Sequence, residues 1–446
     1  MYGLLVDIFL FLFIFLLATL NLVLSVKHRQ FLQILPSFAW ITLSVIPFIY
    51  SQNFFPDTTI FYQTVGIATI GIALLLGDLY SILFVISQKD YKNTNLNTLK
   101  LRSFLYILTG LIFLIPVVHI YLTGSIPLIN KVFGDFTSLE TSISREIYMK
   151  ISIPYWFKVI SNWCVTLIGP TLLTILIYKR KFWQAILIFA WTLFYAYSST
   201  EKAPSVFLII SIIIILAQFQ KDSIRNFISV GILTIFGITI IMGTHYGNTM
   251  IKRSEECPTP VGVNLTPGNI ARSCSNDNLI TINPIVDRIG YRVFLTPIEV
   301  SNYWYQYYNF ESHKKRSINE LVSRNSKPQA ANEVGIWAFQ RSFPEKYLST
   351  VSAYSSIDAD AYSFGGIPAI LFVSLILLLI RIYISRSKDP NNLYEKILNG
   401  LGTTFLLLFP FQASLQAMLI PQGLLVIILS IFILRNRKIL TKLINK

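Results

Sequence analysis

Long uninterrupted apolar runs restrict most strongly what this chain can fold into. A helix of about 20 residues crosses the roughly 30 Å hydrocarbon core of a bilayer, and the chain holds eleven runs of about that length. Only 13% of its residues are charged, whereas soluble domains carry about a quarter. We therefore expect an all-α integral membrane protein with about 11 transmembrane helices. The runs cover residues 4–26, 31–50, 60–87, 103–121, 157–178, 182–197, 204–219, 227–246, 363–384, 397–418 and 419–434.

Basic residues are concentrated in alternate connections between these runs. These connections contain twenty lysines and arginines, including Arg381 and Arg435, and four acidic residues. An excess of lysine and arginine marks the cytoplasmic side, which predicts a periplasmic N-terminus and a cytoplasmic C-terminus. The net charge of +15 is then a topology signal and not a sign of nucleic-acid binding. The first run lacks a basic start and a small-residue cleavage site, so we expect it to remain as a helix.

Two connections on the predicted outer side are long. Residues 1–246 hold the first eight helices and a first periplasmic loop, 123–153; residues 247–362 form a large periplasmic loop subdomain; and residues 363–446 hold the last three helices and a cytoplasmic tail. A connection of this length is usually functional. The aromatic residues of the large loop could stack on sugar rings, pack into the core of the loop or lie at the membrane interface. They are Tyr303, Trp304, Tyr305, Tyr307, Tyr308, Trp337 and Phe339.

Two of the three cysteines lie in the large loop. Cys257 and Cys274 flank a turn-rich segment of sixteen residues, and the spacing predicts a disulfide if the compartment is oxidising, as a bacterial periplasm is. Cys164 lies inside a predicted helix and is expected to be a small core residue.

Ionisable residues close to the membrane lie mostly at the predicted outer ends of helices. These residues are Asp7, His119, Lys158, Glu201, Lys202 and His245. Only Asp78 lies deeper, toward the cytoplasmic half of its helix. A coupled transporter should instead hold charges near the middle of the membrane. The distribution therefore favours chemistry or binding at the outer face.

Four cations of the predicted outer side are candidates for an anion site. They are Arg145, Lys202, and the pair Arg288 and Arg292, which are spaced i, i+4 and would share one face if Asp287 caps a short helix. Such a group could hold a diphosphate through charge-assisted hydrogen bonds. Each cation could equally be an anchor near lipid headgroups, and Lys202 could pair with Glu201.

Candidates for acid–base work are fewer. Asp358 and Asp360 form an Asp-x-Asp triplet just before a glycine-rich return to the membrane. One of them could be a general base, or the triplet could hold a divalent metal or cap a helix. His245 and His313 are alternative bases. The chain has no Gly-x-x-x-x-Gly-Lys-[Ser/Thr] phosphate loop, no paired histidines for zinc and no Gly-x-Ser-x-Gly elbow, so we expect no cofactor and no bound metal.

These features together resemble the bacterial oligosaccharide repeat-unit polymerases, the Wzy-type O-antigen or capsule polymerases. The resemblance covers essentially the whole chain, while its motifs are short. They are Gly124-Ser125-Ile126-Pro127-Leu128 followed by Arg145, then Thr200-Glu201-Lys202, then Asp360 with Ser363-Phe364-Gly365-Gly366. The family commonly has arginine where this chain has Lys202, and lysine loses the bidentate geometry.

The resemblance implies a metal-independent glycosyltransferase with a GT-C-like bundle, in the bacterial inner membrane. Its substrates would be two undecaprenyl-diphosphate-linked glycans at the periplasmic face. Arg145, Lys202, Arg288 and Arg292 would bind the leaving diphosphate, Arg341 would steer an acidic glycan, and Asp360, Asp358 or His245 would be the base. Besides the lipid bilayer, a chain-length regulator and a flippase are the partners that such an enzyme would work with.

Two other functions stay open on the sequence. An O-antigen ligase differs from a polymerase only in its acceptor, which the sequence does not reveal. A transporter or flippase of a lipid-linked or anionic substrate is disfavoured by the long outer subdomain and by the absence of an inverted repeat.

Overall fold

A computed structural model provides the fold. It describes residues 2–28, 30–51, 57–87, 98–124, 126–134, 144, 148, 154–199, 203–219, 296–310, 316–317, 326–342, 355–386, 392–408 and 415–436. Within these ranges the chain forms helices and no strand, so the expected all-α class is confirmed.

The helices of the first half of the chain begin with the long α1. In order they are α1 (Tyr2–His28), η1 (Phe31–Ile34), α2 (Leu35–Trp40), η2 (Ile41–Val45), α3 (Ile46–Ser51), α4 (Asp57–Ser87), α5 (Thr98–Thr123), α6 (Pro127–Phe133), α8 (Tyr155–Trp163), η4 (Cys164–Ile168), α9 (Gly169–Tyr178), α10 (Phe182–Tyr197) and α11 (Ala203–Ala217). Those of the second half are α15 (Thr296–Phe310), α17 (Ser326–Ser342), α18 (Ile357–Gly365), α19 (Ile367–Ser385), α20 (Leu393–Leu408), α21 (Leu415–Leu419) and α22 (Leu424–Arg435).

Six helical segments are long and apolar enough to cross a membrane. They are Phe9–His28, Phe31–Ser51, Thr59–Phe84, Leu105–Thr123, Tyr155–Tyr178 and Ile367–Ser385. Three shorter apolar helices, Phe182–Tyr197, Pro204–Ala217 and Leu424–Arg435, coincide with further predicted spans. The predicted span 397–418 corresponds to the shorter helix α20, and 227–246 lies outside the described residues.

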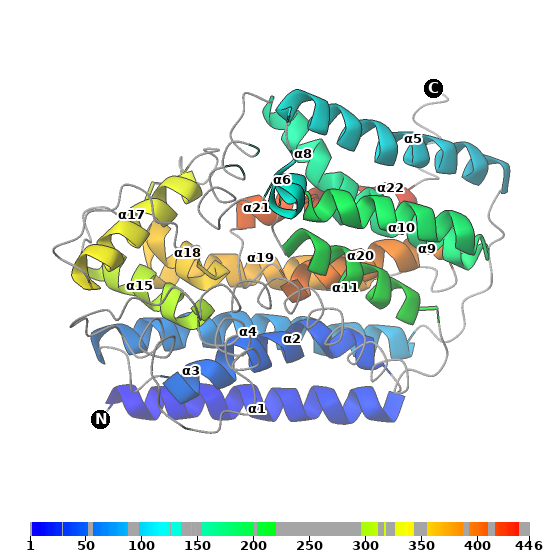
Figure 1. Ribbon diagram of the computed structural model, residues 1–446. Coiled ribbons are helices and arrows are strands. Elements are labelled where there is room, and N and C mark those ends of the chain that lie inside the picture. Colours follow the sequence, from blue (N-terminus) through cyan, green and yellow to red (C-terminus); the bar gives the residue numbers. More distant parts are fainter. Residues whose placement is uncertain are drawn as a thin grey trace, which may run out of the picture.

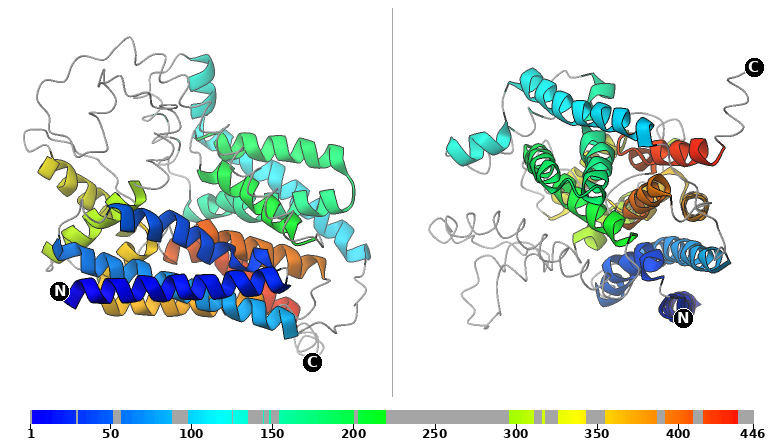
Figure 2. Two further views of the ribbon diagram at one scale, coloured as in Figure 1. Left: turned by 90° about the horizontal axis from the view of Figure 1, so that it is seen from below. Right: turned by 90° about the vertical axis from the view of Figure 1, so that its right-hand side faces the viewer.

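The helices run side by side in one bundle (Figure 1). Helices α1 and α4 begin at the end where α5 and α10 finish, and α15, α17 and α18 also lie there. We call this the α15 end of the bundle. An end-on view places α1 and α5 on opposite sides, with α20 between them (Figure 2).

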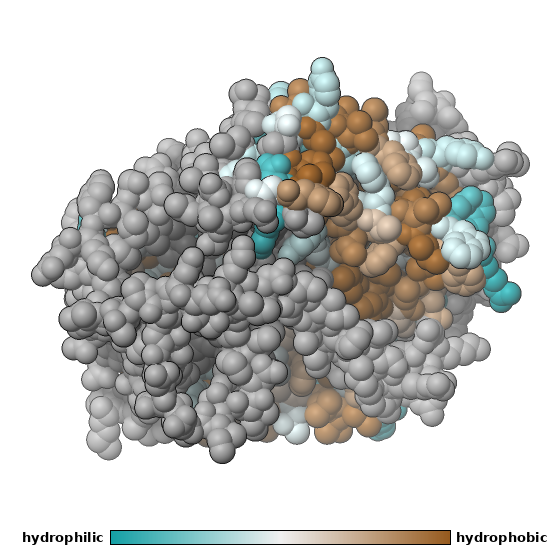
Figure 3. Space-filling view, viewed as in Figure 1, coloured by the Kyte–Doolittle hydropathy of each residue, from teal (hydrophilic) through white to brown (hydrophobic). Residues whose placement is uncertain are grey.

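Large apolar side chains cover much of the outer surface of the bundle. On α10, Trp183 is 80% exposed, and Phe182 and Leu187 also face outward. Brown, hydrophobic atoms gather over the region of α5 and α10 in Figure 3. Soluble proteins rarely leave such patches uncovered, so this surface suits contact with lipid.

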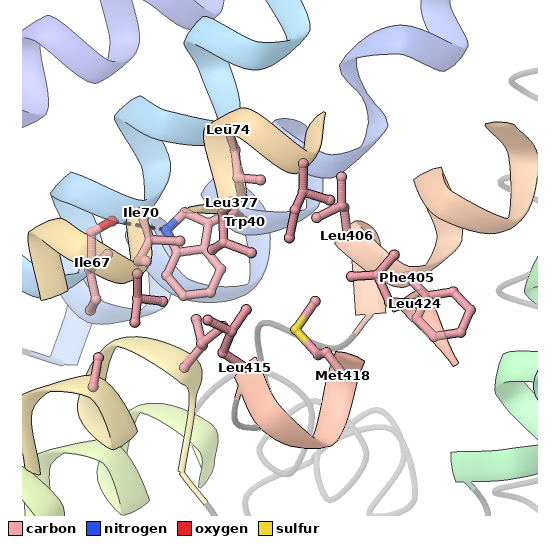
Figure 4. Packing of buried hydrophobic residues seen from close by; sticks show 14 of the residues in the cluster. Trp40, Ile67, Ile70, Leu74, Leu377, Phe405, Leu406, Leu415, Met418 and Leu424 are labelled. Atoms are coloured by element: carbon pink, nitrogen blue, oxygen red, sulfur yellow. Dashed lines mark hydrogen bonds between the residues drawn. The ribbon is translucent and has the colours of Figure 1, made fainter. Parts of the chain in front are cut away.

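Two large apolar cores and two small clusters lie among the described residues. The larger one joins helices of the first and last parts of the chain, and the buried Trp40 lies in it, donating its indole N–H to the carbonyl of Ile67 at 2.9 Å (Figure 4). The smaller core joins α5, α8, η4, α9, α10 and α11. Cys164 is fully buried in the smaller core, which confirms its predicted role as a core residue.

A buried ion pair corrects one part of the charge assignment. Arg381 is not a loop residue: it lies inside α19, its Nε donates to Oδ1 of Asp78 at 2.6 Å, and the two side chains are 1% and 0% exposed. Its Nη2 also donates to the backbone oxygen of Gln33 at 2.7 Å, and its Nη1 to Thr403 Oγ1 at 3.4 Å. A Cβ added to Gly77 would come within 2.6 Å of Arg381. This glycine therefore lets α19 cross α4 closely enough for the pair to form.

The turn at residues 420–423 is bound to the middle of the segment Tyr155–Tyr178. Trp163 Nε1 donates to the Ile420 carbonyl at 3.1 Å, and Thr166 Oγ1 donates to the Gln422 carbonyl at 2.9 Å. Non-helical backbone at membrane depth needs such partners.

Candidate functional site

The carboxylates singled out in the sequence lie in α18, at the α15 end of the bundle. Helix α18 begins after Ser356, and Asp358 and Asp360 lie in its first turn, where negative charge favours helix formation. It ends at Gly366, whose φ of 69° and ψ of −144° break the helix before α19 starts. The return to the bundle thus begins several residues earlier than the predicted span at 363.

Asp358 is sealed inside the protein. It is 0% exposed, and its Oδ2 accepts a hydrogen bond from the Tyr305 hydroxyl at 3.0 Å while its Oδ1 accepts one from the Ser356 hydroxyl. Burial raises the pKa of the Asp358 carboxyl, while the hydrogen bonds from Ser356 and Tyr305 lower it. Burial, together with the nearby Asp358, raises the pKa of the Tyr305 hydroxyl well above its ordinary value. At neutral pH this tyrosine is therefore a hydrogen-bond donor to the carboxyl.

The Tyr305–Asp358 contact is packed directly on the backbone of α4. A Cβ added at Gly66 would lie 2.0 Å from the Tyr305 hydroxyl oxygen and 3.1 Å from Oδ2 of Asp358. Only glycine leaves room for both groups. The residue at position 66 therefore decides whether α15 and α18 can meet here.

Asp360 pairs with an arginine from the large loop. Arg316 Nη1 donates to Oδ1 of Asp360 at 2.8 Å and to Ser363 Oγ at 3.2 Å, and the Arg316 and Asp360 side chains are each 5% exposed. The Arg316 backbone N–H donates to the Ser363 carbonyl at 2.9 Å, and the guanidinium carbon lies 4.0 Å from the centroid of the Phe364 ring. The loop is thus clasped to the end of α18. No sequence motif singled out Arg316, although a buried aspartate implies a partner.

Helix α15 is attached to α4 by buried amides and by aromatic packing. Asn302 Nδ2 donates to Gln63 Oε1 at 2.8 Å, and Gln63 Nε2 donates to the Ile298 carbonyl at 3.1 Å. Four of the predicted aromatic residues are buried: Trp304, Tyr305, Tyr307 and Tyr308. These four residues belong to the larger apolar core of the bundle, together with residues of α4 and α19, and not to a separate core of the loop. None of them presents a free face to a sugar.

A second buried polar group lies at the same end of the bundle, between α5 and α10. We call it the His119 cluster, and it consists of His119, Tyr148, Tyr195 and Ser198. His119 Nδ1 lies 2.6 Å from the Tyr195 hydroxyl oxygen, and its ring centroid is 4.8 Å from that of Tyr148. The hydroxyls of Tyr148 and Ser198 are 2.9 Å apart. This contact joins Tyr148, which precedes α8 in the chain, to the turn after α10.

Most of the predicted cations lie outside the described residues. Arg341 lies in α17, but its side chain is not among those described, and the remaining predicted site residues fall outside the described ranges. Those are Arg145, Lys202, His245, Arg288 and Arg292, together with His313 and the cysteines Cys257 and Cys274. The described part of the chain contains no group of three His, Cys, Asp or Glu residues that could hold a metal ion.

Comparison with known proteins gives no assignment of family or function. No protein family, no curated protein and no solved structure matches the chain significantly.

Proposed function

We propose that this protein polymerises undecaprenyl-diphosphate-linked oligosaccharide repeat units at the periplasmic face of the inner membrane. It would transfer the growing glycan to a hydroxyl of the incoming unit and release undecaprenyl diphosphate. The apolar helices are compatible with a multi-pass membrane protein.

The contact between Tyr148 and Ser198 carries this proposal. Ser144 and Tyr148 flank Arg145 in the chain, while Ser198 lies four residues before Lys202. The 2.9 Å contact between Tyr148 and Ser198 joins the two segments from which those cations come. Two cations drawn from different segments could act on one diphosphate, and negative charge grows on that group as its bond to the sugar breaks.

The second support for the proposal is the attachment of the large loop to the α15 end of the bundle. The Arg316–Asp360 ion pair and the Tyr305–Asp358 hydrogen bond attach the large loop to α18. This attachment would hold the cations of that loop in a fixed position. Interactions that stabilise a transition state must be held in place before reaction. Three arginines of this loop would then act on the substrates. Arg288 and Arg292 would bind the diphosphate, and Arg341 would steer an acidic glycan.

Transport is the less supported alternative. Asp78 lies about 10 Å from the middle of the span Thr59–Phe84 at about 1.5 Å per residue, and both of its oxygens accept hydrogen bonds. A pair sealed in this way, away from the middle of the membrane, does not resemble the accessible midplane site of a transporter.

Deletion and restoration of the gene test the proposal in the bacterium that carries it. We expect the ladder of long surface glycans to collapse to core plus a single repeat, and complementation to restore it. Loss of every repeat-bearing species would instead indicate a flippase or a ligase, and an unchanged ladder would contradict a role in this pathway.

Variants then test the cations. Arg145→Ala and Arg288→Ala should each abolish polymer at unchanged protein level, whereas Lys181→Ala, an exposed cation at the opposite end of the bundle, should leave the ladder intact. Equal tolerance of all three changes would rule out the diphosphate clamp.

A further inference from the structure

We propose that His119 accepts the proton of the attacking sugar hydroxyl, an inference that rests on the proposed polymerase function. The two carboxylates of α18 leave this task open. Asp358 is 0% exposed and bound on both oxygens, and Asp360 is bound to the buried Arg316. A base must come within hydrogen-bond reach of the proton that it takes, and His119 is better placed to do so.

The ring of His119 is held in one orientation with one nitrogen left over. Its Nδ1 lies 2.6 Å from the Tyr195 oxygen, and Tyr148 and Phe157 pack on the ring with centroids at 4.8 and 6.2 Å. When Nδ1–H donates to Tyr195, the lone pair of the neutral imidazole is on Nε2. Within the described chain, Nε2 has no hydrogen-bond partner, and the residue is 9% exposed. A base oriented by a third group is the arrangement that activates hydroxyl nucleophiles.

The position of His119 matches the site of the proposed reaction. It lies four residues, or about 6 Å, before the end of α5, at the α15 end of the bundle. Its neighbour Tyr148 makes the contact with Ser198 that joins the segments carrying Arg145 and Lys202. The base would thus act on the attacking hydroxyl, and the cations would act on the leaving diphosphate.

The acceptor oxygen forms a bond to the anomeric carbon while its proton moves to Nε2 of His119, giving an imidazolium. The bond between the anomeric carbon and the diphosphate oxygen breaks, and its electron pair leaves with undecaprenyl diphosphate. The imidazolium then returns its proton to water or to the released diphosphate.

A pH profile of polymer formation tests this role with the full-length protein in detergent and undecaprenyl-diphosphate-linked repeat units as substrate. Among the described residues, the titratable groups that face His119 are Tyr148, Lys158 and Tyr195. For the wild type, we expect the rate to fall about tenfold per pH unit on the acid side, as one imidazole becomes protonated. His119→Gln should lower the rate by about 10²- to 10⁴-fold and remove that acid limb. Tyr195→Phe should lower the rate less and keep the acid limb. His28→Gln should match the wild type, because His28 ends α1 far from the α15 end of the bundle.

Several results would overturn the inference. If wild type and His119→Gln form polymer at rates within threefold and with the same acid limb, His119 is not the base, although the polymerase function stands. If the wild type forms no polymer at any pH, the proposed function fails and the inference falls with it.

Chemical modification keeps the test decisive if His119→Gln does not fold. Diethyl pyrocarbonate should modify His119 in the wild-type protein, in parallel with loss of polymer formation, and saturating lipid-linked repeat unit should slow that modification but not the modification of His28. Mass spectrometry reports both sites. An unmodified His119, continued activity after its modification, or an unchanged modification rate with substrate would each contradict the proposal.

Discussion

Single glycines decide how closely the helices of this protein approach one another. At Gly66 the space that a side chain would need is occupied by the Tyr305 hydroxyl, 2.0 Å from the position of a Cβ. Gly66→Ala should therefore displace Tyr305 and break its hydrogen bond to Asp358, destabilising the protein by about 1–3 kcal/mol. Thermal unfolding of the purified protein in detergent measures this change.

Gly110 provides the matched control. It lies in α5, and a Cβ there would meet nothing within 4 Å, so Gly110→Ala should be neutral or stabilising because alanine favours helix. Equal effects of the two substitutions would show that Tyr305 does not need the space at Gly66.

The Asp78–Arg381 pair allows a second prediction at the scale of residues. Arg381→Met leaves Asp78 buried without its cation and should lower stability by about 3–5 kcal/mol, and Asp78→Leu should do likewise for Arg381. The double variant should recover most of the loss, since apolar pairs of similar volume often replace buried ion pairs at little cost. Unfolding temperatures of the three variants compare them directly, and additive losses would refute the coupling.

The sequence drew attention to two aspartates of α18 but not to their partners. Asp358 and Asp360 stood out because they precede a glycine-rich return to the membrane. Tyr305 and Arg316 lie 53 and 44 residues before them in the chain, and no local pattern encodes such contacts. Arg381 was assigned to a loop because it lies close to the basic connection that follows α19.

At the scale of elements, the break between α18 and α19 depends on one of two adjacent glycines. Gly366 has a φ of 69° and a ψ of −144°, a region that is almost restricted to glycine. Gly366→Ala should therefore destabilise the protein by about 1–3 kcal/mol and loosen the Arg316–Asp360 clasp. Limited proteolysis of the large loop, compared with wild type, would detect the loosened clasp.

Gly365 is the control for this prediction. A Cβ added there would meet only the Cβ of Ala369, at 3.5 Å, which is an ordinary contact. Gly365→Ala should leave both stability and the proteolysis pattern close to those of wild type. If Gly366→Ala behaves in the same way, the break does not depend on the glycine conformation.

Helix type and approximate position were largely predictable, whereas helix ends were not. Apolar runs of about 20 residues report burial in lipid, and six of them correspond to long described helices. The same signal cannot separate lipid-facing backbone from backbone that is buried in protein. The turn at residues 420–423 lies where the predicted run 419–434 begins, yet it leaves the helix, and Trp163 and Thr166 bind its Ile420 and Gln422 carbonyls.

At the scale of the whole molecule, the ends of the bundle should face different compartments. We expect the α15 end to be periplasmic and the turn at Lys179–Lys181 to be cytoplasmic, because of its basic residues. In a background without native cysteines, Ser317→Cys should react with a membrane-impermeant maleimide on spheroplasts. Lys179→Cys should react only after lysis, and the reverse pattern would invert the predicted topology.

The larger core has a consequence for how the chain is made. Asp78 and Arg381 are separated by 303 residues, so at about 5–20 residues per second the ribosome needs roughly 15–60 s after inserting the aspartate to deliver its partner. During that interval α4 holds an acidic side chain that no cation neutralises, and the core of the first helices is incomplete until α19 arrives. A chain truncated before α19 would carry this defect permanently, which would mark it for membrane proteases that remove incompletely assembled proteins.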